Sequence, residues 1–293
     1  MAVEEPMPLT LYWIQCGACS GDSMSLLSLE SPDIAELAAL LDLEVLWHPS
    51  LSNGSHTYHR RLLDALCAGD RPLDILCVEG AVIQGPNGTG LYDTFAGTPK
   101  MDIVAGLAGR AGVVVAVGTC ASHGGICGRG DIGATGLQFR QRDKGGFLGE
   151  AFRGGLGLPV VNLPGCPCHC DVVAGVLAAV KAGIIPALNE FNAPLPWYGT
   201  LIHQGCVRNE YHEYRVEERD FGDKGCLFFH MGCRGPLTHG PCNKLLWNRR
   251  NSKTRAGVPC VGCTEPDFPR AQRDEEGERE ADPQAGSVAE GVD

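Results

Sequence analysis

Apolar residues recur with two different periods in the first 184 positions. Short, nearly continuous apolar runs are typical of buried strands, and longer segments with apolar residues every three to four positions indicate amphipathic helices. The predicted strands are 9–15, 43–48, 73–80, 112–118 and 158–165, and the predicted helices are 33–42, 58–69, 101–111 and 171–183. Strands that alternate with helices predict an α/β fold with a doubly wound parallel sheet.

The pattern changes near residue 185, where a proline-rich connection begins. Residues 200–270 show little apolar periodicity but contain six cysteines and four histidines. A segment with so few apolar residues in register buries little core by itself, so we expect an inorganic group to stabilise it. We therefore predict one domain over 1–184 and a second over 185–270.

The charge is concentrated at the carboxyl end. The net charge is −11, and residues 271–293 are rich in acidic and poor in apolar side chains, which predicts a disordered tail. An acidic balance argues against nucleic acid as a partner. The low share of charged residues, 20%, suggests that a partner protein covers much of the surface. Without a membrane span or export signal in the sequence, we expect a cytoplasmic protein, or one peripheral to the inner face of the membrane.

Fifteen cysteines are the most informative feature of the composition. An odd number in a chain expected in a reducing compartment favours metal ligation over disulfides. Cys67 and Cys77 lie in ordinary helix and strand patterns, so we expect them to be buried small hydrophobic residues.

Other cysteines directly follow predicted strands. Cys16 and Cys19 follow the first strand, Cys120 follows the fourth and Cys166 follows the fifth. Because the carboxyl ends of parallel strands meet at one edge of a sheet, we expect these thiols to converge there.

The second segment carries further ligand-type residues with regular spacing. They are His203, Cys206, Cys226, Cys233, Cys242, Cys260 and Cys263. One zinc ion could use the HxxC and CxxC pairs, His203, Cys206, Cys260 and Cys263. Too many ligand-type residues then remain, so the spacing favours iron–sulfur clusters over a single zinc ion.

Eight motifs in this order resemble the small, electron-transferring subunit of [NiFe]-hydrogenases over residues 9–270. They are CxGxS after the first strand, CVEGAV, GTCAS, LPGCP, HxxCxR, GCRGP, a cysteine before NKLLWN, and PCVGCTEPDFP. The resemblance implies a flavodoxin-like domain followed by an irregular iron–sulfur domain. It also implies H2 oxidation at a Ni–Fe centre in a partner large subunit, with electrons relayed through three clusters to a quinone or protein acceptor. We expect an oligomer of such heterodimers.

Matching motifs then imply the ligands of each cluster. The proximal [4Fe-4S] cluster would use Cys19, Asp22, Cys120 and Cys166. The distal [4Fe-4S] cluster would use His203, Cys206, Cys226 and Cys233. The medial cluster would use Cys242, Cys260 and Cys263, and it is expected to be [3Fe-4S] because no fourth cysteine precedes its CxxC pair.

The first proximal pair allows two alignments with the family pattern. Pairing Cys16 with Cys19 places Ala18 where the family has glycine, whereas pairing Cys19 with Asp22 brings Gly21 and the serines into line. The second alignment resembles the oxygen-insensitive, high-affinity actinobacterial-type branch, so we expect an oxygen-tolerant enzyme. Two alternatives stay open: Asp22 is only a helix N-cap, or Cys16 is an extra ligand.

Several other residues and two rival functions stay open at this point. The additional cysteines Cys127, Cys168 and Cys170 could be incidental or could ligate in another redox state. Glu79 could transfer protons or orient a loop, and His169 could hydrogen-bond a cluster sulfide. The rival functions are a complex I-like electron-transfer subunit, which would have a single cluster, and a zinc-stabilised binding module.

Overall fold

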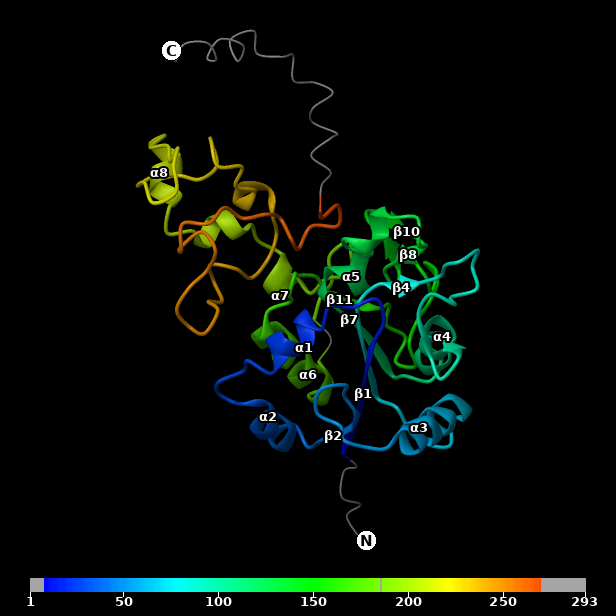
Figure 1. The fold of residues 1–293 in the computed structure, drawn as a ribbon. Coiled ribbons are helices and arrows are strands. Elements are labelled where there is room, and N and C mark those ends of the chain that lie inside the picture. Colours follow the sequence, from blue (N-terminus) through cyan, green and yellow to red (C-terminus); the bar gives the residue numbers. More distant parts are fainter. Residues whose placement is uncertain (1–7, 185, 270–293) are drawn as a thin grey trace, which may run out of the picture.

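The computed structural model describes residues 8–184 and 186–269. Its centre is a five-stranded parallel sheet in the order β11-β7-β3-β1-β2 (Figure 1). The strands are β1 (Leu9–Gln15), β2 (Leu43–Trp47), β3 (Ile75–Glu79), β7 (Val113–Val117) and β11 (Val161–Leu163). In order of appearance this is 2-1-3-4-5, the flavodoxin-like order, so the predicted strands and fold class are confirmed.

Helices cover both faces of the sheet (Figure 1). One face packs against α3 (His56–Ala68) and α4 (Lys100–Ala108), and the other against α1 (Gly21–Leu26), α2 (Ile34–Leu40) and α6 (Cys170–Lys181). The central strands β3 and β7 are buried along their whole length, as expected for a parallel sheet covered on both sides.

The ends of the helices follow from local sequence. The Ser55 side chain accepts from the amide of Tyr58 at the start of α3, and Gly69 ends that helix at a φ of 84°, which glycine adopts without strain. Asp33 and Glu36 form a capping box at the start of α2.

Small elements surround the carboxyl edge of the sheet, and a few short helices interrupt the otherwise irregular second segment. They are β4 (Val82–Ile83), β5 (Thr94–Phe95), β6 (Thr98–Pro99), β8 (Ala134–Thr135), β9 (Phe139–Arg140), β10 (Asp143–Lys144), α5 (Gly118–His123), α7 (Leu195–Tyr198), α8 (Asn209–Glu213), and the 3-10 helices η1 (Cys127–Arg129), η2 (Ile202–Gly205) and η3 (Gly235–Leu237). Between Tyr198 and residue 269, the last one described, the chain has a small core of its own, centred on Ile202, Leu227, Cys233 and Cys260.

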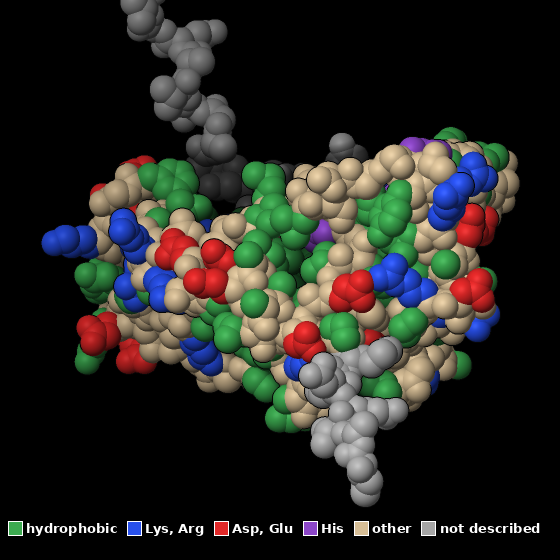
Figure 2. All heavy atoms as spheres, turned by 90° about the horizontal axis from the view of Figure 1, so that it is seen from below, with side chains coloured by type: hydrophobic (Ala, Val, Ile, Leu, Met, Phe, Trp, Pro, Cys, Tyr) green, Lys and Arg blue, Asp and Glu red, His purple; other side chains and the backbone are tan. Residues whose placement is uncertain are grey.

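The predicted boundary at 185 falls on a residue outside the described ranges, as does the predicted tail 271–293, so both stay predictions. None of the helices within 8–184 and 186–269 has the length and hydropathy needed to cross a bilayer. Seen from below in Figure 2, apolar side chains alternate on this face with charged side chains of both signs.

Candidate metal centres

The predicted proximal ligands all follow strands whose last residues lie in register. Gln15 pairs with Glu79, Glu79 with Val117, and Val117 with Leu163, so four strands end side by side. Immediately beyond them lie the loop before α1 with Cys19, the first turn of α1 with Asp22, the start of α5 with Cys120, and the loop before α6 with Cys166. The sheet topology therefore brings these four residues to one edge.

Asp22 lies inside helix α1, not at its N-cap. Ser20 occupies the cap position at a φ of 62° and makes no capping bond through its side chain. The Oδ1 atom of Asp22 instead accepts from the backbone amide of Cys168, at 2.7 Å and 146 positions away in the chain. The N-cap interpretation of Asp22 is therefore wrong, because its carboxylate accepts a hydrogen bond from the loop that precedes α6 and not from its own helix.

The second oxygen of Asp22 faces Gly118, the first residue of α5. Gly118 has a φ of +84°, and a Cβ atom there would lie 2.1 Å from Asp22 Oδ2. Glycine is thus needed at this position both for its backbone conformation and for the room it leaves the carboxylate. With Oδ1 occupied by the amide of Cys168, Oδ2 is the atom that Asp22 would offer to the predicted proximal cluster.

Burial dominates the acid–base properties of Asp22. Desolvation raises the pKa of its carboxyl to about 7, the amide of Cys168 opposes this rise, and the nearby Glu79 adds to it. A buried carboxylate that is costly to ionise by itself would be stabilised in its charged form by iron ions bound beside it.

Glu79 is fully buried under helix α1 and accepts five hydrogen bonds. Its donors are Trp13 Nε1 and Gln15 Nε2 at 3.0 Å, the amides of Asp22 and Ser23 at 3.1 and 3.3 Å, and Ser23 Oγ at 2.5 Å. These contacts join β1, β3 and the first turn of α1. Of the two roles considered for Glu79, the structure supports that of orienting the loop that carries Asp22.

The proximal thiols also affect one another. Burial raises the pKa of Cys120 to about 12, and the negative charges of Cys166, Cys127 and Asp22 raise it further. The pKa of Cys166 is raised first by burial and then by Cys263, Asp22 and Cys19. These four predicted ligands therefore lie within electrostatic reach of one another.

Cys16 lies apart from this group, so the expectation that it converges with the other three thiols is wrong. Its thiol is buried in the core between the sheet and helices α3 and α4, together with Ile14 and Val82. Burial raises its pKa to about 12, and the charged groups acting on it are Asp93 and Lys100, not the proximal ligands. Cys77 is also buried, as predicted for a small hydrophobic residue. Cys67, for which burial was also predicted, is half-buried.

The predicted medial ligands line a cavity of about 90 Å³. Cys242, Cys260 and Cys263 form its wall with Trp247, and Cys166 of the proximal set borders the same space. Burial raises the pKa of Cys242 to about 12, with Cys263 and Cys260 adding to the rise.

The predicted distal ligands His203, Cys206, Cys226 and Cys233 line a second, smaller cavity. The medial and distal sets adjoin, because the backbone amide of Cys260 donates to Cys233 Sγ at 3.3 Å. A residue that the sequence did not single out, His212 of α8, lies beside this cavity with its Nδ1 atom 3.5 Å from Cys226 Sγ. Only its presence among the histidines of the segment could have drawn attention to it.

The surroundings of these thiols fit iron–sulfur clusters. Backbone amides donate to Cys206 Sγ from Arg208 at 3.4 Å, to Cys233 Sγ from Gly235 at 3.5 Å, and to Cys260 Sγ from Gly262 at 3.4 Å. Hydrogen bonds to sulfur of this kind stabilise the electron-rich thiolates of clusters.

A zinc ion fits less well. Tetrahedral Zn–S bonds of about 2.3 Å bring the ligand atoms within roughly 4 Å of one another. Within the described ranges, His169, Cys170 and Asp171 are the one group with three such atoms inside 4.8 Å, and it contains none of the predicted cluster ligands. Nδ1 of His169 already accepts from the amide of Asp171, as the N-cap of α6.

Two of the cysteines outside the predicted ligand sets, Cys168 and Cys127, border the predicted sites. Cys168 is fully buried, with its Sγ atom 3.9 Å from the hydroxyl of Tyr198. Cys127 packs beside Cys120 against Ala81 and Ile83. The roles left open for these thiols stay predictions.

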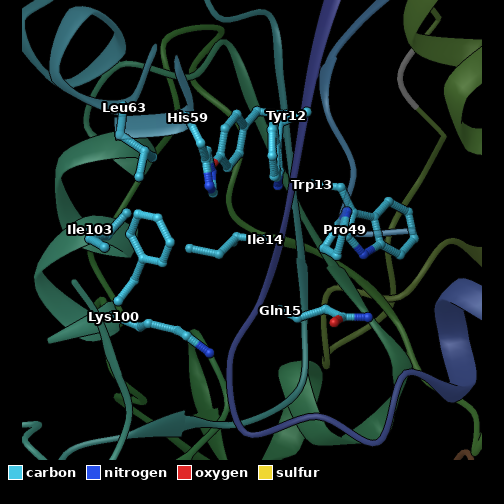
Figure 3. Close-up of a pocket in the computed structure, with 11 residues that line it drawn as sticks. Tyr12, Trp13, Ile14, Gln15, Pro49, His59, Leu63, Lys100 and Ile103 are labelled. Carbon is cyan, nitrogen blue, oxygen red and sulfur yellow. The ribbon is translucent and has the colours of Figure 1, made fainter. Parts of the chain in front are cut away.

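A cavity of about 270 Å³ lies away from the thiols, between β1 and helices α3 and α4. Figure 3 shows Ile14, Leu63 and Ile103 pointing into it, with Trp13 on the other side of β1. His59 stacks on Trp47 at 3.6 Å between ring centroids and bonds the hydroxyl of Tyr12 at 2.6 Å. In the part of the chain that the structure describes, no cysteine lines this space, so it is separate from the candidate metal centres.

Two family models match the chain in succession. Residues 19–180 match the family described as NADH ubiquinone oxidoreductase, 20 Kd subunit, and residues 198–274 match the family described as the C-terminal part of the NiFe/NiFeSe hydrogenase small subunit. The second match distinguishes the chain from a complex I-like subunit, since it covers the segment that holds the predicted medial and distal ligands.

Relatives extend over nearly the whole chain. The F420 non-reducing hydrogenase I small subunit of Methanosarcina mazei is 32% identical and covers 90% of this chain and 74% of its own length. The periplasmic [NiFe] hydrogenase small subunit 1 of Nitratidesulfovibrio vulgaris is 30% identical, with coverages of 88% and 79%.

Solved structures agree with these relatives. The actinobacterial-type NiFe-hydrogenase of Ralstonia eutropha H16 has a TM-score of 0.81 at 26% identity, covering 90% of this chain and 80% of its own. The Ni-Fe-Se hydrogenase of Desulfomicrobium baculatum has a TM-score of 0.77 at 28% identity, with coverages of 89% and 96%. The chain therefore belongs to the family of [NiFe]-hydrogenase small subunits.

Proposed function

We propose that this chain relays electrons from a Ni–Fe centre in a partner large subunit, through a proximal, a medial and a distal iron–sulfur cluster, to a quinone or protein acceptor. The order of the three ligand sets in space carries the proposal. Cys166 adjoins Cys263, and Cys260 adjoins Cys233, so each set borders the next. Bound at these sites, the clusters would accept and pass on one electron at a time.

The residues of this chain would hold the clusters and exclude water. The proximal cluster would be held by Cys19, Asp22, Cys120 and Cys166. The medial cluster would be held by Cys242, Cys260 and Cys263. The distal cluster would be held by His203, Cys206, Cys226 and Cys233. Since the medial set has three thiols, we assign it [3Fe-4S], and we assign [4Fe-4S] to the other two.

Exposed apolar side chains near the proximal site support a large-subunit interface there. Met24 in α1, Leu91 and Tyr92 in the loop after β4, and Ile126 before η1 are each more than half exposed. Exposed apolar patches are typical of protein interfaces, so we propose that these side chains lie in the interface with the large subunit. Small subunits of this family pair with a large subunit, and an oligomer of such heterodimers is our expectation for the assembly.

The Asp22 carboxylate connects the chain with the oxygen-insensitive, actinobacterial-type branch. A carboxylate is a harder ligand than a thiolate, and its position against Gly118 is built into the fold. Similarity to the actinobacterial-type enzyme of Ralstonia eutropha supports this assignment. Hydrogen uptake measured under air, with and without preincubation in oxygen, tests it; loss of uptake within minutes would contradict it.

We also keep the cytoplasmic side of the membrane as the proposed location. All fifteen cysteines are unpaired, which suits a reducing compartment. Fractionation of cells into cytoplasm, membrane and exported material, followed by detection of the protein, tests this; recovery in the exported fraction would overturn it.

The decisive experiment for the relay is iron and acid-labile sulfide analysis of the anaerobically purified complex, with EPR of its oxidised and reduced forms. The proposal predicts about 11 irons in this chain, besides the one at the Ni site. About 9 or 10 irons with additional three-iron signals would remove Asp22 from the ligand set. Zinc in place of iron would overturn the proposal.

A further inference from the structure

The imidazole of His212 is fixed beside the predicted distal site. It belongs to α8, at the end of the second segment that lies far from the sheet (Figure 1). Its ring stacks on Phe229 with centroids 5.3 Å apart and meets Phe228 edge-on at 5.4 Å. It also meets His203, a predicted ligand, edge-on at 4.5 Å. Three aromatic neighbours thus hold the orientation of one ring.

That orientation directs Nδ1 of His212 at Cys226 Sγ, 3.5 Å away. A metal-bound thiolate can only accept, so the proton of the neutral imidazole must be on Nδ1 for the contact to form. Arg208 is the nearby cation, but its guanidinium is engaged by Glu218, the carbonyl of Gly225 and the carbonyl of Thr254. His212 is therefore the side chain free to donate to this sulfur.

The other distal thiols take their N–H hydrogen bonds from the backbone; the Thr254 hydroxyl, 3.6 Å from Cys206 Sγ, donates to Asn243 Oδ1. Cys206 receives the amide of Arg208, and Cys233 receives those of Gly235 and Cys260. Cys226 receives the amide of Phe228 and, in addition, the imidazole. A side-chain donor can be removed by substitution while the backbone donors stay in place.

We propose that His212 sets the redox potential of the distal cluster by donating a hydrogen bond from Nδ1 to the sulfur of Cys226. The role rests on the proposed relay, because it requires a cluster at this site. An N–H···S bond is stronger to the more negative, reduced cluster, so it favours reduction. His212 is thus a positioning and tuning residue and not an iron ligand.

The test uses the holoenzyme complex and two substitutions at one position. His212→Phe keeps the packing against Phe228 and Phe229 but removes the donor, and His212→Asn places an amide N–H near the position of Nδ1. His230→Phe is the matched control, since His230 lies in the same segment but bonds Glu217 at 2.5 Å. The potential of the distal couple is measured by an EPR-monitored redox titration.

At the wild-type midpoint potential, His212→Phe should lower the ratio of reduced to oxidised distal cluster roughly fivefold to tenfold. Tenfold corresponds to about 59 mV for one electron. His212→Asn should recover most of this shift, and His230→Phe should leave the ratio unchanged. ENDOR of the wild-type cluster should show an exchangeable proton that His212→Phe lacks.

Several results would overturn the proposal. An unchanged midpoint in His212→Phe, or a wild-type cluster without any exchangeable proton, would show that no such bond tunes the cluster, and the second result refutes the proposal even where a variant fails to assemble. Loss of the cluster in His212→Phe but not in His203→Phe would make His212 a ligand. Absence of any distal couple from a wild-type complex would refute the relay itself, whereas a distal couple with an unchanged midpoint in His212→Phe would refute only the role of His212.

Discussion

Replacing Gly118 by alanine is expected to displace Asp22 from the proximal site. The new Cβ atom would lie 2.1 Å from Asp22 Oδ2 and 2.7 Å from its Cγ atom. Real Cβ contacts are not shorter than 3.0 Å, so the carboxylate must retreat by about 1 Å. Metal–ligand distances tolerate deviations of only about 0.2 Å, so a carboxylate that moves this far stops binding.

The energetic cost has two parts. An alanine at a φ of +84° costs roughly 1–2 kcal/mol in backbone strain. Displacing the carboxylate also endangers its bond from the amide of Cys168, and a hydrogen bond to a charged group contributes about 1.5–3 kcal/mol. The backbone strain applies to any glycine in the left-handed region, whereas the loss of the hydrogen bond is specific to this site.

Gly97→Ala separates the two parts. Gly97 has nearly the same φ, +82°, but no atom lies within 4 Å of a Cβ built there. Both variants should lose stability in denaturant titrations of the complex, but only Gly118→Ala should lose proximal EPR signals and between one and four irons. Full iron content and an unchanged proximal signal in Gly118→Ala would refute the argument that Asp22 Oδ2 faces a cluster.

Three further predictions follow from single residues. Glu79→Ala leaves five buried donors without their acceptor and should cost at least about 3 kcal/mol in unfolding free energy, together with the proximal EPR signal. Cys16→Ala should leave the iron content unchanged and cost only about 1 kcal/mol, since its thiol lies in the core; loss of iron would make it a ligand. Burial lowers the pKa of His123 to about 4, so the unfolded state binds the proton first and stability is lost as the pH falls from 6.5 to 4. His123→Phe should abolish up to about 3 kcal/mol of this loss in denaturant titrations between pH 7 and pH 4. Plots of unfolding free energy against pH that run parallel for the variant and the wild type would contradict this prediction.

The strands could be predicted from sequence because their signal is local. β3 and β7 are continuous apolar runs, and both are buried along their whole length. Once parallel strands are assigned, the rule that their carboxyl ends share an edge places Cys19, Cys120 and Cys166 together without any knowledge of side-chain contacts. The convergence of these thiols was therefore predictable.

The polar contacts of the site could not be predicted, because they join positions far apart in the chain. Glu79 meets the amide of Asp22 across 57 positions, and the amide of Cys168 meets Asp22 across 146. No periodicity records such pairs. The N-cap interpretation of Asp22 failed for the same reason: an aspartate before a helical segment has a capping pattern, and only the tertiary structure shows that its oxygen bonds elsewhere.

Desolvation of the predicted ligands suggests how residues 200–269, which have so small a core, are stabilised. Burial raises the pKa of Asp22 to about 7 and those of Cys120 and Cys242 to about 12, so the folded chain disfavours the charged forms that bind metal. On the proposed assignment, iron bound to the same atoms would favour these forms, and the free energy of binding would then stabilise the fold that brings the ligands together. The apolar centre at Ile202 and Leu227 would then need only to align the thiols, and the bound clusters would supply the rest of the cohesion between residues 200 and 269.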